Sequence, residues 1–420
     1  MSKRLIAPIL CVLLTAPALA QTAPLQFQCD GVHLLQARQK FLAHDPAIVA
    51  AVRKIVSSAD SMIKDGPFTI VHKLHPLAGV DPHDYVSLAP YYWPNPKTPS
   101  GLPYIRKDGQ RNPEIHQYDA KPFSDMSKRV WTLALAGYLS GDSRYSNRAV
   151  LLIRVWFFDP QTRMNPNLDH AQLVEGTDLG RGTGIIESCR LLPVIDAVEL
   201  LRLSSAWTPQ DDASMIAWFR AYTNWMMTSR NGKAESAATN NHGVWYDDQL
   251  MTYLLFLNDP ADARRVAQTA ATKRIAAQIR PTGQMPRELG RTNAFSYSVF
   301  NLNAFTLLAD LAQRVHVDLW HFKTQDGRCI QAAIDWMLPY ATGRQKWGYQ
   351  QISGKIDASG LVVPLRRVSY ALNDPAYEAV IPRLKGVTSA DNLRYPPIFK
   401  SPTTPVQKSP DEEEEPPTGD

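Results

Sequence analysis

The chain has 420 residues, of which 44% are hydrophobic, and its formal net charge at pH 7 is +5. It has only four cysteines, so a disulfide framework cannot hold so long a chain together, although a single bridge to Cys29 stays open. No segment after the first twenty residues is apolar enough to span a bilayer, which excludes a stable membrane anchor. The length suffices for one large or two ordinary domains.

The first twenty residues have the pattern of a secretory signal peptide. Lys3 and Arg4 form a basic start, an apolar stretch runs through Leu14, and Ala18 and Ala20 provide the small residues of a cleavage site. We therefore expect a bacterial protein that is exported to the periplasm or secreted.

The rest of the chain has mostly helical periodicity. Met126, Val130, Leu133 and Gly137 are spaced as one face of a helix. Similar apolar stripes predict helices within residues 48–63, 149–157, 185–203, 215–227, 249–257, 266–279, 299–311 and 329–337. Strand patterns are scarce, so the sequence predicts an all-α fold.

The tripeptide Asp-Pro-Ala occurs at residues 45–47, 259–261 and 374–376. It places an N-cap aspartate before a proline in the first helical turn. The second and third copies directly follow an apolar helical segment, and residues 141–142 are a candidate for a fourth corner. Successive helical hairpins joined in this way indicate a toroid or a solenoid.

A long segment between residues 67 and 122 is rich in proline and aromatic residues and cannot be a regular helix. A loop of this length inside a compact domain is more often a binding element or a lid than a simple connection. Tyr91, Tyr92 and Trp93 lie within it, and their rings are suited to stacking on sugars. They are equally suited to closing one end of the helical core, and the sequence leaves both interpretations open.

Two polar clusters are expected just ahead of apolar helices. The first, residues 238–247, contains Asn240, Asn241 and His242, and the second, residues 284–298, contains two arginines and a tyrosine. Side chains of these kinds gathered at helix starts are often functional.

The two clusters contain the groups that β-elimination in a uronate polymer requires. Asn241 and Arg291 are suited to bind the sugar carboxylate and so to stabilise the carbanion that forms when the C5 proton leaves. Either His242 or Tyr297 can remove that proton, and a tyrosine can protonate the departing O4. Tyr297 would need a cation such as Arg291 beside it to act as a phenolate. No metal or other cofactor is needed.

The sequence Asn-Asn-His-Gly at 240–243, Arg287-Glu288 with Arg291 and Tyr297, and the loop at 87–96 resemble the alginate lyase family. The likeness extends over roughly residues 45–347. It implies an incomplete α/α toroid that binds polyuronate in a central groove, with alginate or glucuronan as substrate. It also implies a catalytic set, which falls here on Asn241, His242, Arg291 and Tyr297. The expected substrate-binding residues are Tyr91, Tyr92, Trp93, Glu187, Asn240, Tyr246 and Arg287.

Two other classes of function stay open. A glycoside hydrolase on a similar toroid needs two carboxylic acids at the scissile bond. The candidates for that pair are Glu187, Asp247, Asp248 and Glu288. Glu187 and Glu288 are equally suited to orienting the arginines. A carbohydrate-binding protein without catalytic activity would use the same aromatic and basic side chains.

The predicted organisation is a signal peptide at 1–20, one catalytic domain at 21–399, and a disordered, proline-rich acidic tail at 400–420. The signal carries two positive charges and the tail a net charge of −4, which leaves +7 for the domain. Such a domain favours an anionic partner, and in an exported protein an acidic polysaccharide fits better than nucleic acid. The sequence does not indicate the oligomeric state.

Overall fold

The structure is a computed structural model that describes residues 22–384 and 389–395. The predicted signal peptide and acidic tail lie outside the described residues. Within the described part of the chain, no helix is both long and apolar enough to cross a membrane.

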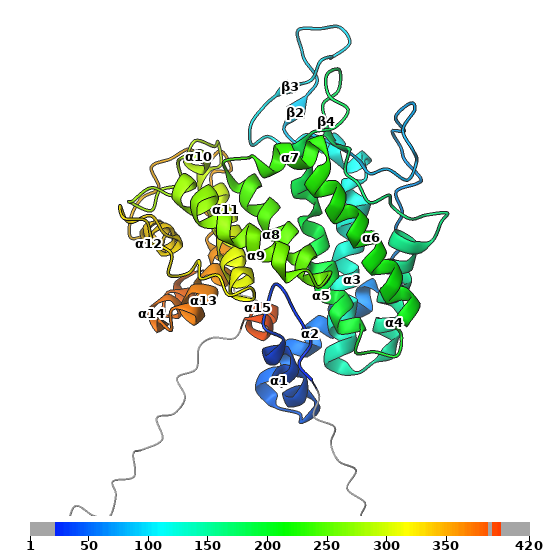
Figure 1. Ribbon diagram of the computed structural model, residues 1–420, viewed down its shortest axis with the longest axis vertical. Coiled ribbons are helices and arrows are strands. Elements are labelled where there is room, and N and C mark those ends of the chain that lie inside the picture. Colours follow the sequence, from blue (N-terminus) through cyan, green and yellow to red (C-terminus); the bar gives the residue numbers. More distant parts are fainter. Residues whose placement is uncertain (1–21, 385–388, 396–420) are drawn as a thin grey trace, which may run out of the picture.

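The described chain is built almost entirely of helices, which confirms the predicted all-α class (Figure 1). Its longer helices are α1 (Gly31–Leu42), α2 (Pro46–Met62), α3 (Ala120–Ser140), α4 (Ser143–Ile153), α5 (Leu192–Leu201), α6 (Pro209–Thr228), α8 (Asn241–Phe256), α9 (Pro260–Ala270), α11 (Ala294–Gln313), α12 (Ile330–Ala341) and α13 (Val362–Ala371). The shorter ones are α7 (Arg230–Ser236), α10 (Pro286–Leu289), α14 (Pro375–Glu378) and α15 (Ser389–Arg394).

Three predicted helices differ from the structure in type or extent. The first half of the stripe at 185–203 is a 3₁₀ helix, η3 (Gly182–Leu191), which continues into α5. The C-terminal ends of α4 and α9 continue as π-helical turns, η2 (Arg154–Phe158) and η4 (Ala271–Ala276). Apolar spacing alone cannot separate these helix types, because it reports the buried face and not the hydrogen-bond register.

The corners form as the Asp-Pro-Ala pattern predicts, since α2, α9 and α14 each begin at the proline of one copy. Asp259 accepts a hydrogen bond from the backbone N–H of Asp262, which is a free donor of the first turn. The residue before each aspartate has a positive φ: 59° at His44, 59° at Asn258 and 49° at Asn373. This left-handed residue ends one helix, and the capped aspartate starts the next.

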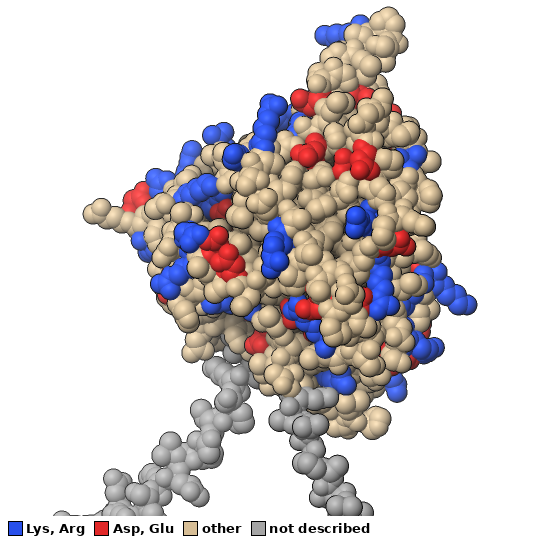
Figure 2. All heavy atoms as spheres, turned by 45° about the vertical axis from the view of Figure 1, so that its right-hand side comes forward, with Lys and Arg blue, Asp and Glu red and all other residues tan. Residues whose placement is uncertain are grey.

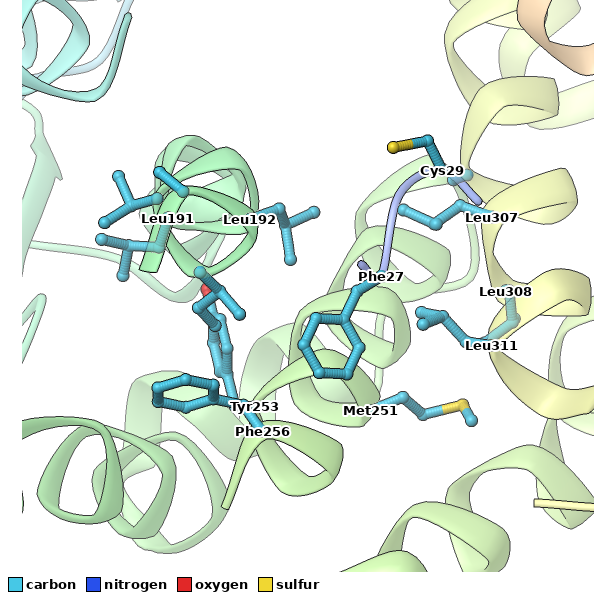
Figure 3. Close-up of a cluster of buried hydrophobic side chains, with 14 of the residues drawn as sticks. Phe27, Cys29, Leu191, Leu192, Met251, Tyr253, Phe256, Leu307, Leu308 and Leu311 are labelled. Carbon is cyan, nitrogen blue, oxygen red and sulfur yellow. The ribbon is translucent and has the colours of Figure 1, made fainter. Parts of the chain in front are cut away.

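One hydrophobic cluster extends from Phe27 to Leu393. Figure 3 shows its centre, where Phe27 of the N-terminal segment lies between side chains of α8 and α11, with Leu192 of α5 nearby. The helix α8 packs against α9 and α11, and α3 packs against α2, α4 and α5. Neighbouring helices therefore share one continuous core.

The predicted non-helical segment holds three of the four short strands, β1 (Val86–Leu88), β2 (Tyr92–Trp93) and β3 (Ile105–Arg106). Strand β1 runs parallel to β4 (His170–Leu173), and β2 pairs with β3 as an antiparallel hairpin. The hairpin lies at the same end of the molecule as α7 and α10, whereas α1 and α15 lie at the opposite end (Figure 1).

Candidate active site

A cleft of about 670 Å³ opens at the end that carries the hairpin. Its walls come from the hairpin region, η3, and the first turns of α8 and α11. The lining residues are Pro90, Tyr91, Tyr92, Arg106, Arg111, Gln172, Arg181, Thr183, Ile186, Glu187, Cys189, Arg190, Ala238, Asn240, Asn241, His242, Arg291, Tyr297 and Phe300. All four predicted catalytic residues are among them, although they lie in or next to the first helical turns and not in loops well ahead of the helices.

His242 lies in the first turn of α8, and its Nδ1 is 2.6 Å from Oε1 of Glu235 on α7. Glu235 is 2% exposed, so its carboxylate is a fixed acceptor for an Nδ1–H proton. This bond sets the tautomer in which Nε2 carries the free lone pair. His242 itself lines the cleft, so Nε2 is its group available to a substrate.

Asn241 is completely buried and is held by Glu288 of α10. The backbone N–H of Asn241 donates to Oε1 of Glu288 at 2.8 Å, and the side-chain Nδ2 donates to Oε2 at 2.7 Å. Glu288 thus satisfies a free backbone donor at the start of α8 and fixes the amide at the same time. Burial raises the pKa of Glu288, while the bonds from Asn241 oppose that shift. The expectation that Glu288 orients the arginines is therefore wrong, because it orients Asn241.

The bend between α7 and α8 depends on Gly243. A Cβ at this position would lie 2.2 Å from the carbonyl oxygen of Ala238 and 2.3 Å from Nη1 of Arg274. Arg274 is 1% exposed and donates to the carbonyls of Ser236, the last residue of α7, and of Ala238, which lies between the two helices. The glycine leaves room for this guanidinium, which fixes the segment that leads to His242.

On the opposite wall, Arg291 forms a two-pronged ion pair with Asp108, in which Nε and Nη2 donate at distances down to 2.7 Å. Thr292 donates to Asp108 through both its backbone N–H and its hydroxyl. Although burial opposes it, these donors hold the pKa of Asp108 well below its usual value. Asp108 follows the hairpin, so it attaches that element to the start of α11.

Tyr297 lies under Arg291 and beside Tyr91. The guanidinium carbon of Arg291 is 3.6 Å from the centre of the Tyr297 ring, and the Tyr297 hydroxyl is 2.6 Å from that of Tyr91. Burial and the neighbouring Tyr91 raise the pKa of Tyr297, and Arg291 lowers it by less. The expectation that Arg291 makes Tyr297 a phenolate is thus not met, and in the free protein Tyr297 is a protonated phenol at neutral pH.

The predicted binding residues divide into two groups. Tyr91, Tyr92, Glu187 and Asn240 line the cleft. Tyr85 and Ser87 each donate a hydroxyl to Glu187 at 2.7 Å, which fixes its carboxylate.

Three predicted binding residues do not line the cleft. Tyr246 is 3% exposed, and its hydroxyl donates to the carbonyl of Met226, because it points from α8 into the core. Arg287 is exposed on α10 and is not among the residues that line the cleft. Trp93 donates to the carbonyl of Gln110 and stabilises the hairpin. Tyr246, Arg287 and Trp93 thus lie outside the cleft lining, and a binding role for them stays a prediction.

The cleft is strongly basic, whereas the face of the molecule in Figure 2 carries Lys, Arg, Asp and Glu side chains interspersed with one another. Five arginines line the cleft, of which only Arg291 was predicted: Arg106, Arg111, Arg181, Arg190 and Arg291. Glu187 is the only acidic residue among the described lining residues. Phe300, 36% exposed, adds an apolar surface three positions after Tyr297 on α11, a helical spacing that the sequence did contain.

The acids proposed for a hydrolase do not form a pair in this cleft. Asp247 is buried in an ion pair with Arg274, with a contact of 2.7 Å. Asp248 is completely buried, and Glu288 is bound to Asn241. A helical chain with one acid, a histidine, a tyrosine and several arginines in its cleft fits the class of polysaccharide lyases.

Comparison with known proteins agrees with this class. The family model described as alginate lyase matches residues 72–347. A crystal structure of an alginate lyase from Bacteroides ovatus is 37% identical, with a TM-score of 0.85, and the match covers 89% of this chain and 99% of that one. The chain therefore belongs to the alginate lyase family and is a polysaccharide lyase. No curated protein matches the sequence.

More distant structures share the fold alone. Alginate lyase A1-III from Sphingomonas species A1 is 15% identical, with a TM-score of 0.53 over 84% of this chain and 95% of that one. A histidine-to-alanine variant of A1-III in complex with a tetrasaccharide is 14% identical, with a TM-score of 0.52 over 82% and 94%. The shared fold is the α/α toroid that the sequence predicted.

Proposed function

We propose that the chain cleaves a polyuronate by β-elimination in the arginine-lined cleft, with alginate as the first candidate substrate and glucuronan as the second. The observation that carries this proposal is the arrangement of His242 with Glu235 and of Tyr297 with Arg291 around a single basic cleft. The alginate lyase from Bacteroides ovatus supports alginate as substrate.

In this proposal the substrate carboxylate is bound by Asn241 and Arg291. Glu288 and Asp108 hold these two groups in place before substrate arrives, so little reorganisation is needed. Hydrogen bonds to the carboxylate stabilise the charge that builds up when C5 loses its proton. Arg291 binds Asp108 through Nε and Nη2, so its Nη1 is available to the sugar carboxylate.

The elimination then needs a base and an acid. The base takes the C5 proton, the electrons of the C–H bond form the C4–C5 double bond, and the C4–O4 bond breaks as O4 gains a proton. His242 is the base, because its Nδ1 carries the proton and its Nε2 has a free lone pair that can accept one. Tyr297 is protonated and is the acid for O4, with Tyr91 as its hydrogen-bonding neighbour.

The stereochemistry of the substrate decides whether two groups are needed. In guluronate the C5 hydrogen lies anti to O4, so a base and an acid on different sides suit it. In mannuronate and glucuronate the two lie syn, and one group can act as both base and acid. Tyr297 would fill that role only after losing its proton, which its raised pKa opposes in the free enzyme.

The test is to incubate the purified protein with polymannuronate, polyguluronate, glucuronan and a neutral glucan and to follow the ultraviolet absorbance of unsaturated uronate. Absorbance should rise with at least one acidic polymer and not with the glucan. Tyr297→Phe should abolish the rise, and His242→Ala should abolish it on polyguluronate. Reducing ends without absorbance would refute elimination, and full activity of Tyr297→Phe would refute the assigned acid.

The location and organisation of the chain belong to the same proposal. The pattern of residues 1–20 supports export to the periplasm or beyond, where acidic polysaccharides are accessible. The hydrophobic cluster from Phe27 to Leu393 supports one catalytic domain within 21–399.

A further inference from the structure

A second cavity, of about 540 Å³, lies among elements at the end of the molecule opposite to the cleft. The N-terminal segment, the end of α11, one face of α13 and the end of α15 surround it. Its lining residues are Phe27, Gln28, Cys29, Asp30, His33, Asp310, Gln313, Arg314, Arg366, Arg367, Tyr370, Ala371, Arg394 and Tyr395. None of them lines the catalytic cleft.

Helical spacing gathers these side chains. Asp310 and Arg314 are four positions apart at the end of α11, and Arg366 and Tyr370 are four positions apart on α13. Residues at this spacing share one face of a helix. Because α11 packs against α13, the two polar faces line the same cavity.

The cavity has more cations than anions, since its lining includes four arginines but only two aspartates. Arg367 has partners on several sides: it pairs with Asp310 at 3.0 Å and donates to the carbonyl of Gln28 and the hydroxyl of Tyr395. It therefore belongs to the fixed wall.

The other three arginines, Arg314, Arg366 and Arg394, retain unused hydrogen-bonding capacity. Arg366 is 4% exposed and contacts Glu378 at 3.4 Å, but its Nη1 is buried without a hydrogen-bond partner. Such a donor costs free energy unless something in the cavity satisfies it. Arg314 is exposed and donates to the carbonyl of Gln26, and no carboxylate in the described chain forms an ion pair with it. The Nε of Arg394 is likewise buried without a hydrogen-bond partner.

An open aromatic ring lies beside these cations. Tyr370 is 50% exposed, its hydroxyl is 2.7 Å from Nε2 of His33, and the His33 ring meets it edge-on at 5.4 Å. The contact with His33 fixes the orientation of the phenol ring while leaving much of its surface accessible. A cation beside an open aromatic ring recognises a sugar that carries a carboxylate: the guanidinium pairs with the acid, and the ring packs on the apolar sugar face.

We propose that this cavity is a second binding site for oligouronates, with the carboxylate at Arg314 and Arg366 and the sugar ring on Tyr370. The volume is far larger than a bare inorganic anion needs, which favours an acidic sugar. The choice of uronate among acidic sugars rests on the proposed function of the cleft. The site binds substrate or product chains without cleaving them and retains polymer on the enzyme.

The test uses tetramannuronate as probe and isothermal titration calorimetry as readout, in the full chain carrying Tyr297→Phe to prevent cleavage. Two equivalents should bind per chain. Adding Arg314→Glu should remove one equivalent or weaken it at least tenfold, and Tyr370→Ala should do the same without disturbing the bond to Gln26. Arg344→Glu is the matched control, because Arg344 is an exposed arginine that lines neither cavity and should leave both equivalents.

Equal stoichiometry and affinity with and without Arg314→Glu and Tyr370→Ala would overturn the second site. Binding of cellotetraose, a neutral tetrasaccharide, with the same affinity at this site would also overturn it. Failure of the proposed function gives a different result: the unmodified chain would produce no unsaturated uronate, while the equivalent lost with Arg314→Glu would still be measured.

Discussion

At the scale of residues, each proposed catalytic side chain is held by one partner from another segment. The pairs are His242 with Glu235, Asn241 with Glu288, Arg291 with Asp108, and Tyr297 with Tyr91. The four proposed catalytic residues could be selected from the sequence because they occur in short motifs that resemble the family. Three of the partners lie 47, 183 and 206 positions away, so no local spacing pairs them, and only Glu235, at 7 positions from His242, is close in sequence.

Glu235→Gln tests the first of these pairs. The amide cannot accept as strongly from Nδ1–H, so the tautomer and the ring orientation of His242 are no longer fixed. We expect kcat on a His242-dependent polymer to fall by roughly 100-fold, with a much smaller change in KM. Steady-state kinetics measure this, and Glu199→Gln, at a buried ion pair with Arg202 outside both cavities, is the matched control. An unchanged kcat would show that Glu235 does not position the histidine.

Tyr91→Phe tests the Tyr297 pair through pH. Tyr91 is one of the groups that raise the pKa of Tyr297, after burial, whereas Arg291 lowers it. Removing the Tyr91 hydroxyl should therefore lower the pKa of Tyr297. An acid must be protonated to act, so the alkaline decline of kcat should move to lower pH in the variant. A pH–rate profile checks this, and a shift to higher pH would contradict it.

At the scale of elements, the segment between 67 and 122 uses its aromatic residues in two places. Tyr91 and Tyr92 line the cleft, whereas Trp93 is used within the hairpin. The proline and aromatic content of this segment predicted that it is not a regular helix and that it is more than a simple connection. It could not predict Asp108 as the attachment point, because that role depends on Arg291 and Thr292 on the opposite wall.

Asp108→Asn should weaken this attachment. The variant loses the charge that holds Arg291, and hydrogen bonds to charged groups contribute about 1.5–3 kcal/mol each before solvent screening reduces them. We expect faster amide hydrogen exchange across residues 92–111 and at least tenfold lower kcat/KM. Asp326→Asn, at an exposed pair with Arg328, is the control. Unchanged exchange in the hairpin would show that other contacts hold it.

At the scale of the whole molecule, the all-α class, the corners and the family followed from the sequence, because periodicity and capping are local properties. The concentration of arginines in two separate cavities did not follow from the sequence. Acidic and basic residues are interspersed on the face of the molecule that Figure 2 shows, so net charge does not locate a binding site. The fold alone brings Arg106, Arg181 and Arg291 together, and Arg314 and Arg366 at the other end.

Neighbouring acids in the core of α8 should have opposite effects on global stability. Asp248 is completely buried with no hydrogen-bond partner for either oxygen, and burial raises its pKa well above the ordinary 3.8. Asp247 is equally buried but paired with Arg274. When folding raises the pKa of a carboxyl group, protonation of that group stabilises the folded state. This contribution is complete at pH values below the pKa in the unfolded chain, and it is lost as the pH rises through the pKa in the folded protein.

Asp248→Leu should therefore increase the free energy of unfolding at pH 7 by about 1–3 kcal/mol, the cost of an unsatisfied buried polar group. The gain should shrink as pH falls toward 4, because the folded protein binds a proton at Asp248 more readily than the unfolded chain does and is stabilised by it. Asp247→Leu should instead destabilise by about 3–5 kcal/mol, because it leaves the buried guanidinium of Arg274 unpaired. Urea unfolding of both variants at pH 4 and pH 7 measures this, and destabilisation by Asp248→Leu at pH 7 would show that its carboxylate has a stabilising partner.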